Sequence, residues 1–216
     1  MSNTNNTLKG KINTNTIIGL GLLTAIVVVM QFISMGLRFG TFSITLTLIP
    51  IVVGSALYGW GSGAWLGFVF GVTVLLTGDA NLFLAVNIPG TIITVILKGT
   101  LAGAAAGFVY KLISKKNQIA AVIVSAVVAP VVNTGIFVLG SYVFFFDYLS
   151  GLAEGTNLFV FILVGLVGIN FFIELGINLV LNPAILQIIR IGKKNFGGKN
   201  QICLLYTSPS PRDRSL

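Results

Sequence analysis

Residues 17–37 read IIGLGLLTAIVVVMQFISMGL, an apolar run of 21 residues without a charged side chain. A helix needs about 20 such residues to cross the roughly 30 Å hydrocarbon core of a bilayer, so this segment predicts a membrane span. A cleaved signal peptide would have a shorter core followed by a small-residue cleavage site, and residues 35–38 (MGLR) make a poor one. We therefore expect a first helix that is retained.

Five further apolar segments follow, at residues 44–58, 63–77, 91–113, 119–146 and 158–191. Apolar residues make up 55% of the chain and charged residues only 8%, a balance that soluble domains do not show. The sequence therefore predicts an all-α integral membrane protein that folds as a bundle of six transmembrane helices.

The segments between these spans are short. Residues 59–62 (GWGS) predict a tight turn, Pro50 predicts a kink in the second span, and residues 147–157 predict a loop. A polar break at residues 78–81 precedes a short apolar stretch that ends at Asn87. This stretch fits either a re-entrant loop or the ragged start of the fourth span.

The basic residues predict the orientation of the chain. With the N-terminus inside, the basic residues on the cytoplasmic side are Lys9, Lys11, Lys111, Lys115, Lys116, Arg190, Lys193, Lys194 and Lys199. Arg38 is then the single basic residue outside, where Asp79, Asp147 and Glu154 also lie. Because cytoplasmic segments are enriched in Lys and Arg, we expect both ends inside and a multi-pass protein of the cytoplasmic membrane. These charges would face lipid headgroups, so the net charge of +8 does not indicate a nucleic-acid partner.

The chain divides into a membrane domain and short ends. Residues 1–15 are a polar cytoplasmic N-terminus, residues 16–194 form the six-helix membrane domain, and residues 195–201 form a cytoplasmic tail. Residues 203–213 (CLLYTSPSPRD) back-translate into a sequencing-library transposase adapter, and an ATC codon for Ile202 supplies the preceding base. We interpret residues 202–216 as adapter read-through and exclude them from fold reasoning.

Two glycine repeats predict close helix packing. Glycine recurs every fourth residue through the third and fourth spans, at Gly59, Gly63, Gly67 and Gly71 and at Gly99, Gly103 and Gly107. Small residues at this spacing let helix backbones approach closely in lipid. We interpret both repeats as internal packing surfaces.

Lys98 and Glu174 are the two charged residues that lie inside the predicted spans once loops and ends are assigned. A charge in the bilayer is costly, so such residues line a cavity or pair with each other. Asn170, Glu174, Asn178 and Asn182 are spaced four residues apart, which predicts a polar stripe along one face of the last helix.

Asn133 is a predicted neighbour of this stripe. It follows Pro130, which frees a backbone carbonyl, so we expect the fifth span to open locally. The candidate substrate-binding residues are Lys98, Asn133, Asn170, Glu174, Asn178 and Asn87. The alternative is structural: Lys98 and Glu174 form a buried bridge, and the asparagines join helices. If Lys98 contacts a ligand, an anionic group on that ligand is favoured.

Three segments, in their order and spacing, resemble the S components of energy-coupling factor (ECF) transporters. They are residues 48–59 (LIPIVVGSALYG), 63–71 (GAWLGFVFG) and 97–103 (LKGTLAG). The polar stripe with Asn170, Glu174 and Asn178 is similar as well, and the resemblance extends to about residue 194. S components are small membrane proteins that capture vitamins for a shared ATP-driven module.

The resemblance implies a six-helix fold with an outward-facing pocket formed by the last three helices and the outer loops. It implies partners: a transmembrane coupling subunit and two ATPase subunits, with toppling of the S component to release a vitamin or related metabolite inside. It also implies that small residues on the first helix dock the coupling subunit, and Gly21 and Ala25 offer such a pair here.

Two other classes of function are an intramembrane enzyme and a stand-alone transporter. An intramembrane enzyme needs a metal, a carboxylate dyad or a Ser/His pair, and the chain has no histidine and one carboxylate within its spans. We therefore expect no catalysis, no metal and no cofactor. A stand-alone transporter driven by protons at Glu174 is the alternative, which inverted repeats would support. The chain has no phosphate-binding loop of its own, so ATP hydrolysis requires partners.

Overall fold

The structure is a computed structural model of the 216-residue chain, and it describes residues 14–36, 38–39, 42–43, 46–153 and 157–196. The predicted adapter segment and almost all of the two predicted tails lie outside the described residues. The all-α class is confirmed, with one small exception. Arg38–Phe39 (β1) and Phe42–Ser43 (β2) form a two-residue antiparallel pair, in which Arg38 lies opposite Ser43.

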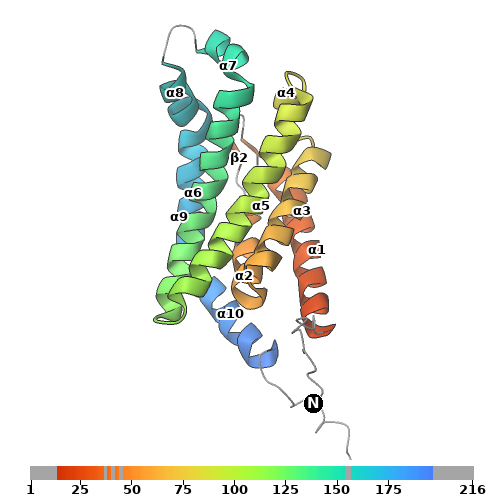
Figure 1. Cartoon of the computed structure of the whole chain (residues 1–216), viewed down its shortest axis with the longest axis vertical. Coiled ribbons are helices and arrows are strands. Elements are labelled where there is room, and N and C mark those ends of the chain that lie inside the picture. The colour runs from red at the N-terminus through yellow and green to blue at the C-terminus, as the bar shows by residue number, and fades with distance from the viewer. Residues whose placement is uncertain (1–13, 37, 40–41, 44–45, 154–156, 197–216) are drawn as a thin grey trace, which may run out of the picture.

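The helices run side by side along one long axis (Figure 1). The longer ones are α1 (Thr14–Gly36), α2 (Leu48–Tyr58), α3 (Trp60–Leu76), α5 (Ile88–Ile113), α6 (Gln118–Phe144), α9 (Ile169–Val180) and α10 (Asn182–Phe196). The shorter ones are α4 (Asn81–Leu84), α7 (Phe146–Leu152), α8 (Leu158–Val160) and the π-helix η1 (Phe161–Gly168). The helices α4, α7 and α8 gather at one end of the bundle, the α7 end, and α10 lies at the opposite end, the α10 end (Figure 1).

Three described helices are long and apolar enough to cross a membrane: Thr16–Gly36 within α1, Ile88–Ile113 and Gln118–Phe144. The pair α9 and α10 makes a fourth if the two are taken as one bent span. The apolar helices α2 and α3 are shorter than a full span. The described residues thus include several helices that are long and apolar enough to span a membrane. The count of six spans and the orientation stay predictions.

Three local expectations are corrected. The turn predicted at residues 59–62 is Gly59 alone, whose φ of 98° suits glycine, and α3 begins at Trp60. Pro50 lies in the first turn of α2, where its missing N–H leaves no helical hydrogen bond unmade, so the predicted kink has no cause there. The loop predicted at residues 147–157 is in large part the helix α7, which begins at Phe146.

The last predicted span is also divided. Its apolar run at residues 158–191 contains the π-helix η1, and a bend of 51° at Leu181 separates α9 from α10. Pro183 follows the break: it has no N–H to donate to the carbonyl four residues earlier, so it cannot continue α9, whereas it is tolerated in the first turn of α10. The four-residue stripe therefore ends with α9, and Asn182 begins another helix.

The glycine repeats pack α3 against α5, as predicted. A Cβ atom on Gly67 would meet the Gly99 carbonyl oxygen, and one on Gly103 would meet the Gly63 carbonyl oxygen. A Cβ atom on Gly71 would lie 2.9 Å from the Val95 carbonyl oxygen. The two helices therefore touch backbone to backbone, which fixes the position of α5 and of Lys98 on it.

A buried glutamine connects three elements near the α7 end. The Gln31 Nε2 atom donates a hydrogen bond of 2.6 Å to Asp79, which lies between α3 and α4, and Thr47 donates one of 3.2 Å to Gln31. Gln31 is 1% exposed. The link holds α1 against the start of α2 and the end of α3.

Replacing Gln31 with leucine should lower the free energy of unfolding by about 1–3 kcal/mol, because the Asp79 carboxylate and the Thr47 hydroxyl each lose a buried partner. Unfolding in detergent, followed by circular dichroism, measures the effect. Phe32→Leu is the matched control, since Phe32 is 58% exposed on the next position of α1. Equal stability of the two variants would contradict the role of the link.

Candidate functional site

Lys98 and Glu174, the two predicted intramembrane charges, lie close together. Lys98 is in α5, and its Nζ atom lies 5.2 Å from the centre of the Phe137 ring of α6. Glu174 is in α9, is only 8% exposed, and lies near enough for its charge to act on Lys98. The opposite charges and the aromatic face offset part of the cost of placing each charge in an apolar bundle.

The asparagines of the predicted stripe extend from Glu174 along α9. Asn178 is 1% exposed, and its amide nitrogen donates a hydrogen bond of 2.9 Å to the backbone carbonyl of Glu174. Asn170 lies one turn before Glu174 and is half-buried. Asn182 is 8% exposed but belongs to α10. The predicted polar face therefore exists on α9.

Asn133 is buried in α6. Below it, Ala129 packs in a cluster with Ile185 of α10, and above it, Phe137 packs against a cluster that contains Val167 of η1. The face of α6 that carries Asn133 therefore contributes, one turn away on either side, to clusters that contain residues of the last helices. We call Lys98, Asn133, Glu174 and Asn178 the polar layer.

Pro130 does not open α6 as expected. The helix continues unbroken from Gln118 to Phe144, and Pro130 is buried within it. Neighbouring helices can satisfy a carbonyl that a proline frees, so a proline in a membrane helix need not break it. Asn133 is therefore presented by a regular helix.

Several buried polar atoms of this region have no hydrogen-bond partner among the described residues. In the polar layer these are the side-chain carbonyl oxygens of Asn133 and Asn178. The same holds for the Asn182 amide nitrogen and for the hydroxyls of Ser125, Thr94 and Ser141. A buried polar group without a partner costs about 1–3 kcal/mol, so these atoms are suited to accept or donate hydrogen bonds to a bound polar molecule.

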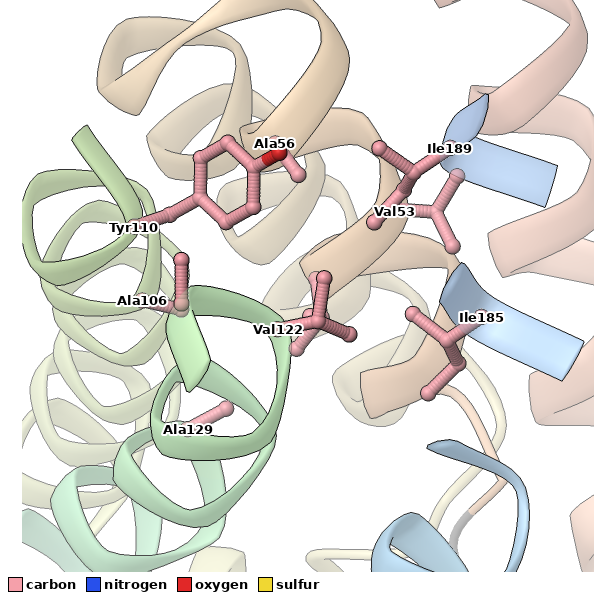
Figure 2. Close-up of a cluster of buried hydrophobic side chains, with 10 residues drawn as sticks. Val53, Ala56, Ala106, Tyr110, Val122, Ala129, Ile185 and Ile189 are labelled. Atoms are coloured by element: carbon pink, nitrogen blue, oxygen red, sulfur yellow. The ribbon is translucent and has the colours of Figure 1, made fainter. Parts of the chain in front are cut away.

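Apolar clusters close the bundle on both sides of the polar layer. Toward the α7 end, Phe83 of α4 makes edge-to-face contacts with Phe137 at 5.5 Å and with Phe145 at 5.0 Å. Toward the α10 end, Tyr110, Val122, Ile185 and Ile189 pack together with small residues of α2, α5 and α6 (Figure 2). The polar layer therefore lies between two apolar layers, where polar interactions are stronger than in water.

Asn87 lies outside the polar layer, at the α7 end. Its side-chain oxygen accepts a hydrogen bond of 3.0 Å from the Gly90 N–H, so it caps the N-terminus of α5. Its amide nitrogen is 3.5 Å from the Phe144 carbonyl oxygen at the end of α6. The residue thereby connects the ends of α5 and α6, and its predicted contact with a substrate stays a prediction.

Gly21 and Ala25, the predicted docking pair, are exposed on α1. No described atom lies within 4 Å of the position where a Cβ on Gly21 would stand. The opposite face of α1 packs inward, where Gly19 meets the side chain of Tyr58 and Val27 is fully buried. The small-residue pair is therefore on the outer face of an edge helix.

No metal site is found among the described residues, since no three His, Cys, Asp or Glu side chains group together there. Sequence reasoning missed Thr94, Ser125 and Ser141. A hydroxyl in a membrane helix can bond a carbonyl of its own helix, so these residues carry no signal in the sequence. Their burial without a partner appears only in the packed structure.

Comparisons with known proteins agree on the kind of fold. Residues 15–186 match the model of a family described as "ECF transporter, substrate-specific component". The comparison with curated proteins gives no match. Among solved structures, the chain is similar to ThiT from Listeria monocytogenes, with a TM-score of 0.59 and 19% sequence identity over 81% of this chain and 97% of that one. At this identity the structural likeness shows the fold alone.

Proposed function

Since the chain belongs to the family of substrate-specific components of ECF transporters, we propose that it captures a vitamin or related water-soluble metabolite outside the cell and delivers it to an ATP-driven module. The family consists of membrane proteins that bind transport substrates rather than enzymes. That the substrate is a vitamin, and that its transport is coupled to ATP hydrolysis, are parts of this proposal.

The observation that carries the proposal is the polar layer. Lys98 and Glu174 place two opposite charges within interaction range in an apolar bundle, and the buried side-chain carbonyl oxygens of Asn133 and Asn178 have no hydrogen-bond partner among the described residues. A purely structural bridge would not need these unsatisfied oxygens. A bound polar molecule would satisfy them, so the arrangement favours a ligand site.

Each residue of the site has a proposed role. Lys98 binds an anionic group of the substrate, while Glu174 accepts hydrogen bonds from its donors and balances the lysine charge. Asn133 and Asn178 supply oriented amide groups, and Asn170 contacts the substrate nearer the α7 end. Asn87 keeps the ends of α5 and α6 together at the entrance and contacts the substrate there.

A panel of radiolabelled vitamins, added to the purified chain ending at Gln201, tests this proposal. We expect one vitamin to bind at equilibrium in the absence of ATP, and unlabelled acids of related structure to compete with it. Binding of no member of the panel, by protein that elutes as a single folded species, would contradict capture of a vitamin.

The Gly21 and Ala25 face is proposed as the contact with the coupling subunit. Gly21→Leu should weaken association with this subunit by roughly 10-fold or more, because the added side chain keeps two helix backbones apart. Vitamin binding should not change, since Gly21 is far from the polar layer on the outer face of α1. Copurification with the tagged coupling subunit and the binding assay measure the two effects.

Gly36→Leu is the matched control for this variant. Gly36 is on the same helix, is exposed, and likewise has no described atom within 4 Å of a Cβ position. Gly36→Leu should associate with the coupling subunit as the wild type does. If both leucine variants lost association with the coupling subunit equally, any large side chain on α1 would have this effect. The docking face would then lie elsewhere.

A proton-coupled transporter is the second candidate, and the buried carboxylate of Glu174 is the observation that favours it. Such a transporter must open a path to the cytoplasm within the bundle. The apolar cluster of Val122, Ile185 and Ile189 fills that path toward the α10 end (Figure 2). Delivery by movement of the whole protein needs no such path, which favours the first candidate.

A further inference from the structure

The helix α10 combines three different faces. Ile185 and Ile189 are fully buried in a cluster with residues of α2 and α6 (Figure 2). A Cβ atom on Gly192 would meet the side chain of Leu57 in α2. On the exposed arc, Ile188 and Ile191 are 49% and 52% exposed. Gln187 and Arg190 are exposed as well. One face of α10 therefore packs on the bundle, while its exposed surface carries both apolar and polar residues.

Basic and apolar positions of α10 are separated around the helix axis. At roughly 100° per residue, the positions of Arg190, Lys194 and Gln187 fall within an arc of about 60°. The positions of Ile191, Ala184 and Ile188 fall within the next arc of about 60°. A helix with adjacent basic and apolar sides is typical of one that lies in the interface between lipid tails and headgroups.

The direction of α10 suits this location. The bend of 51° at Leu181 turns α10 away from the direction of α9 (Figure 1). A helix that continued straight would carry Arg190 away from the bilayer, whereas a tilted one keeps its basic side near the headgroups. The residues that match the family end at 186, so the half of α10 with Arg190 and Lys194 is not part of the matched pattern.

The charged residues that the structure describes at the α10 end are all basic. Lys111, Lys115 and Lys116, at the end of α5 and in the turn to α6, are exposed at the same end of the bundle (Figure 1). The acidic residues among those that the structure describes are Asp79, Asp147 and Glu174, and none of them is at the α10 end. A surface of this kind attracts anionic groups through electrostatics.

We propose that α10 is an interfacial helix whose basic side binds the headgroups of anionic phospholipids, while Ile188 and Ile191 enter the acyl region. The bound lipid holds α10 against the bundle and thereby keeps the apolar cluster of Ile185 and Ile189 closed. The proposal does not depend on the substrate, because it concerns the free protein.

Thermal unfolding in nanodiscs tests the proposal. The chain ending at Gln201 is placed in phosphatidylcholine alone or in phosphatidylcholine with phosphatidylglycerol, without any substrate. We expect phosphatidylglycerol to raise Tm by about 4–8 °C, and we expect high salt to reduce this shift. Arg190→Gln combined with Lys194→Gln should remove most of the shift, whereas Arg38→Gln, at the first helix connection, should keep it.

Equal Tm values in the two lipid mixtures would overturn the proposal, and so would a shift that the double variant retains. If the double variant kept the lipid shift but lost association with the ATPase subunits, the basic side would instead be a protein-docking surface. Because no vitamin is present, failure here leaves the substrate-binding experiment unaffected.

Spin labels give a second readout that does not rely on stability. Cys203 is the only cysteine of the chain, so the chain ending at Gln201 has none and accepts single labels. A label at Ile188→Cys should be relaxed by oxygen dissolved in lipid, and one at Gln187→Cys by a water-soluble nickel complex. Equal exposure of both labels to the nickel complex would place α10 in water and contradict the proposal.

Discussion

Replacing Lys98 with methionine is expected to weaken vitamin binding by about 10- to 100-fold, because a buried hydrogen bond to a charged group contributes about 1.5–3 kcal/mol. Equilibrium binding to the purified variant measures the change. Lys111→Met is the matched control, since Lys111 is exposed in the last turn of the same helix. Wild-type affinity in Lys98→Met would contradict a role for Lys98 in the site.

A double variant of Lys98 and Glu174 distinguishes a ligand site from a bridge that is only structural. Each of Lys98→Met and Glu174→Leu should lower the free energy of unfolding by about 3–5 kcal/mol, because one buried charge then lacks its partner. The double variant should regain much of this stability. A bridge that is only structural would regain binding together with stability, whereas a ligand site would stay empty in the double variant.

Valine at Gly67 is expected to prevent α3 from packing against α5. Its side chain would have to occupy the space of the Gly99 carbonyl group, and a backbone group at a helix contact cannot move aside as a side chain can. We expect a loss of more than about 3 kcal/mol, at or above the upper end for overpacked cores, or no folded protein at all. Size-exclusion chromatography and thermal unfolding in detergent show either result.

Gly61→Val is the control for this prediction. Gly61 is in the same helix, but it is exposed and has no described atom within 4 Å of a Cβ position. The two variants carry the same residue and the same helix propensity, so they differ only in what the side chain meets. A folded Gly67→Val protein with near wild-type stability would show that α3 and α5 do not touch through their glycines.

Two kinds of feature could be predicted from the sequence: residues that recur at a regular spacing, and charged residues whose burial in a membrane costs free energy. The apolar runs predicted the main helices, and the four-residue glycine spacing predicted close internal packing, which the structure locates between α3 and α5. Lys98 and Glu174 were recognisable because charges are rare within apolar spans. In each case the prediction rests on a few residues of one type, either repeated at a fixed spacing or charged within an apolar segment.

The division of the last span was harder to predict. The apolar run at residues 158–191 continues through η1, so the sequence does not indicate where this π-helix begins or ends. The break at Leu181 does have a signal in Pro183, but a membrane helix tolerates many prolines, and Pro130 in the middle of α6 causes no break. Whether a proline ends a helix depends on its neighbours in space.

The role of Asn87 had a clearer signal. An asparagine directly before a helix that has proline in its first turn is a typical N-cap, and Asn87 is followed by Ile88 and Pro89. The hydroxyls of Thr94 and Ser125, in contrast, could not be assigned, because their burial depends on which face of α5 or α6 meets another helix. Sequence spacing alone does not determine that face.

Uptake into proteoliposomes is the most direct test of capture for an ATP-driven module. The vitamin that binds best is offered to vesicles that contain the chain alone with an inward proton gradient, and to vesicles that contain the chain with the coupling subunit and the ATPase subunits. We predict accumulation only with the complete module and ATP, and its loss in Lys98→Met. Accumulation driven by the proton gradient with the chain alone would contradict it and would identify a proton-coupled transporter.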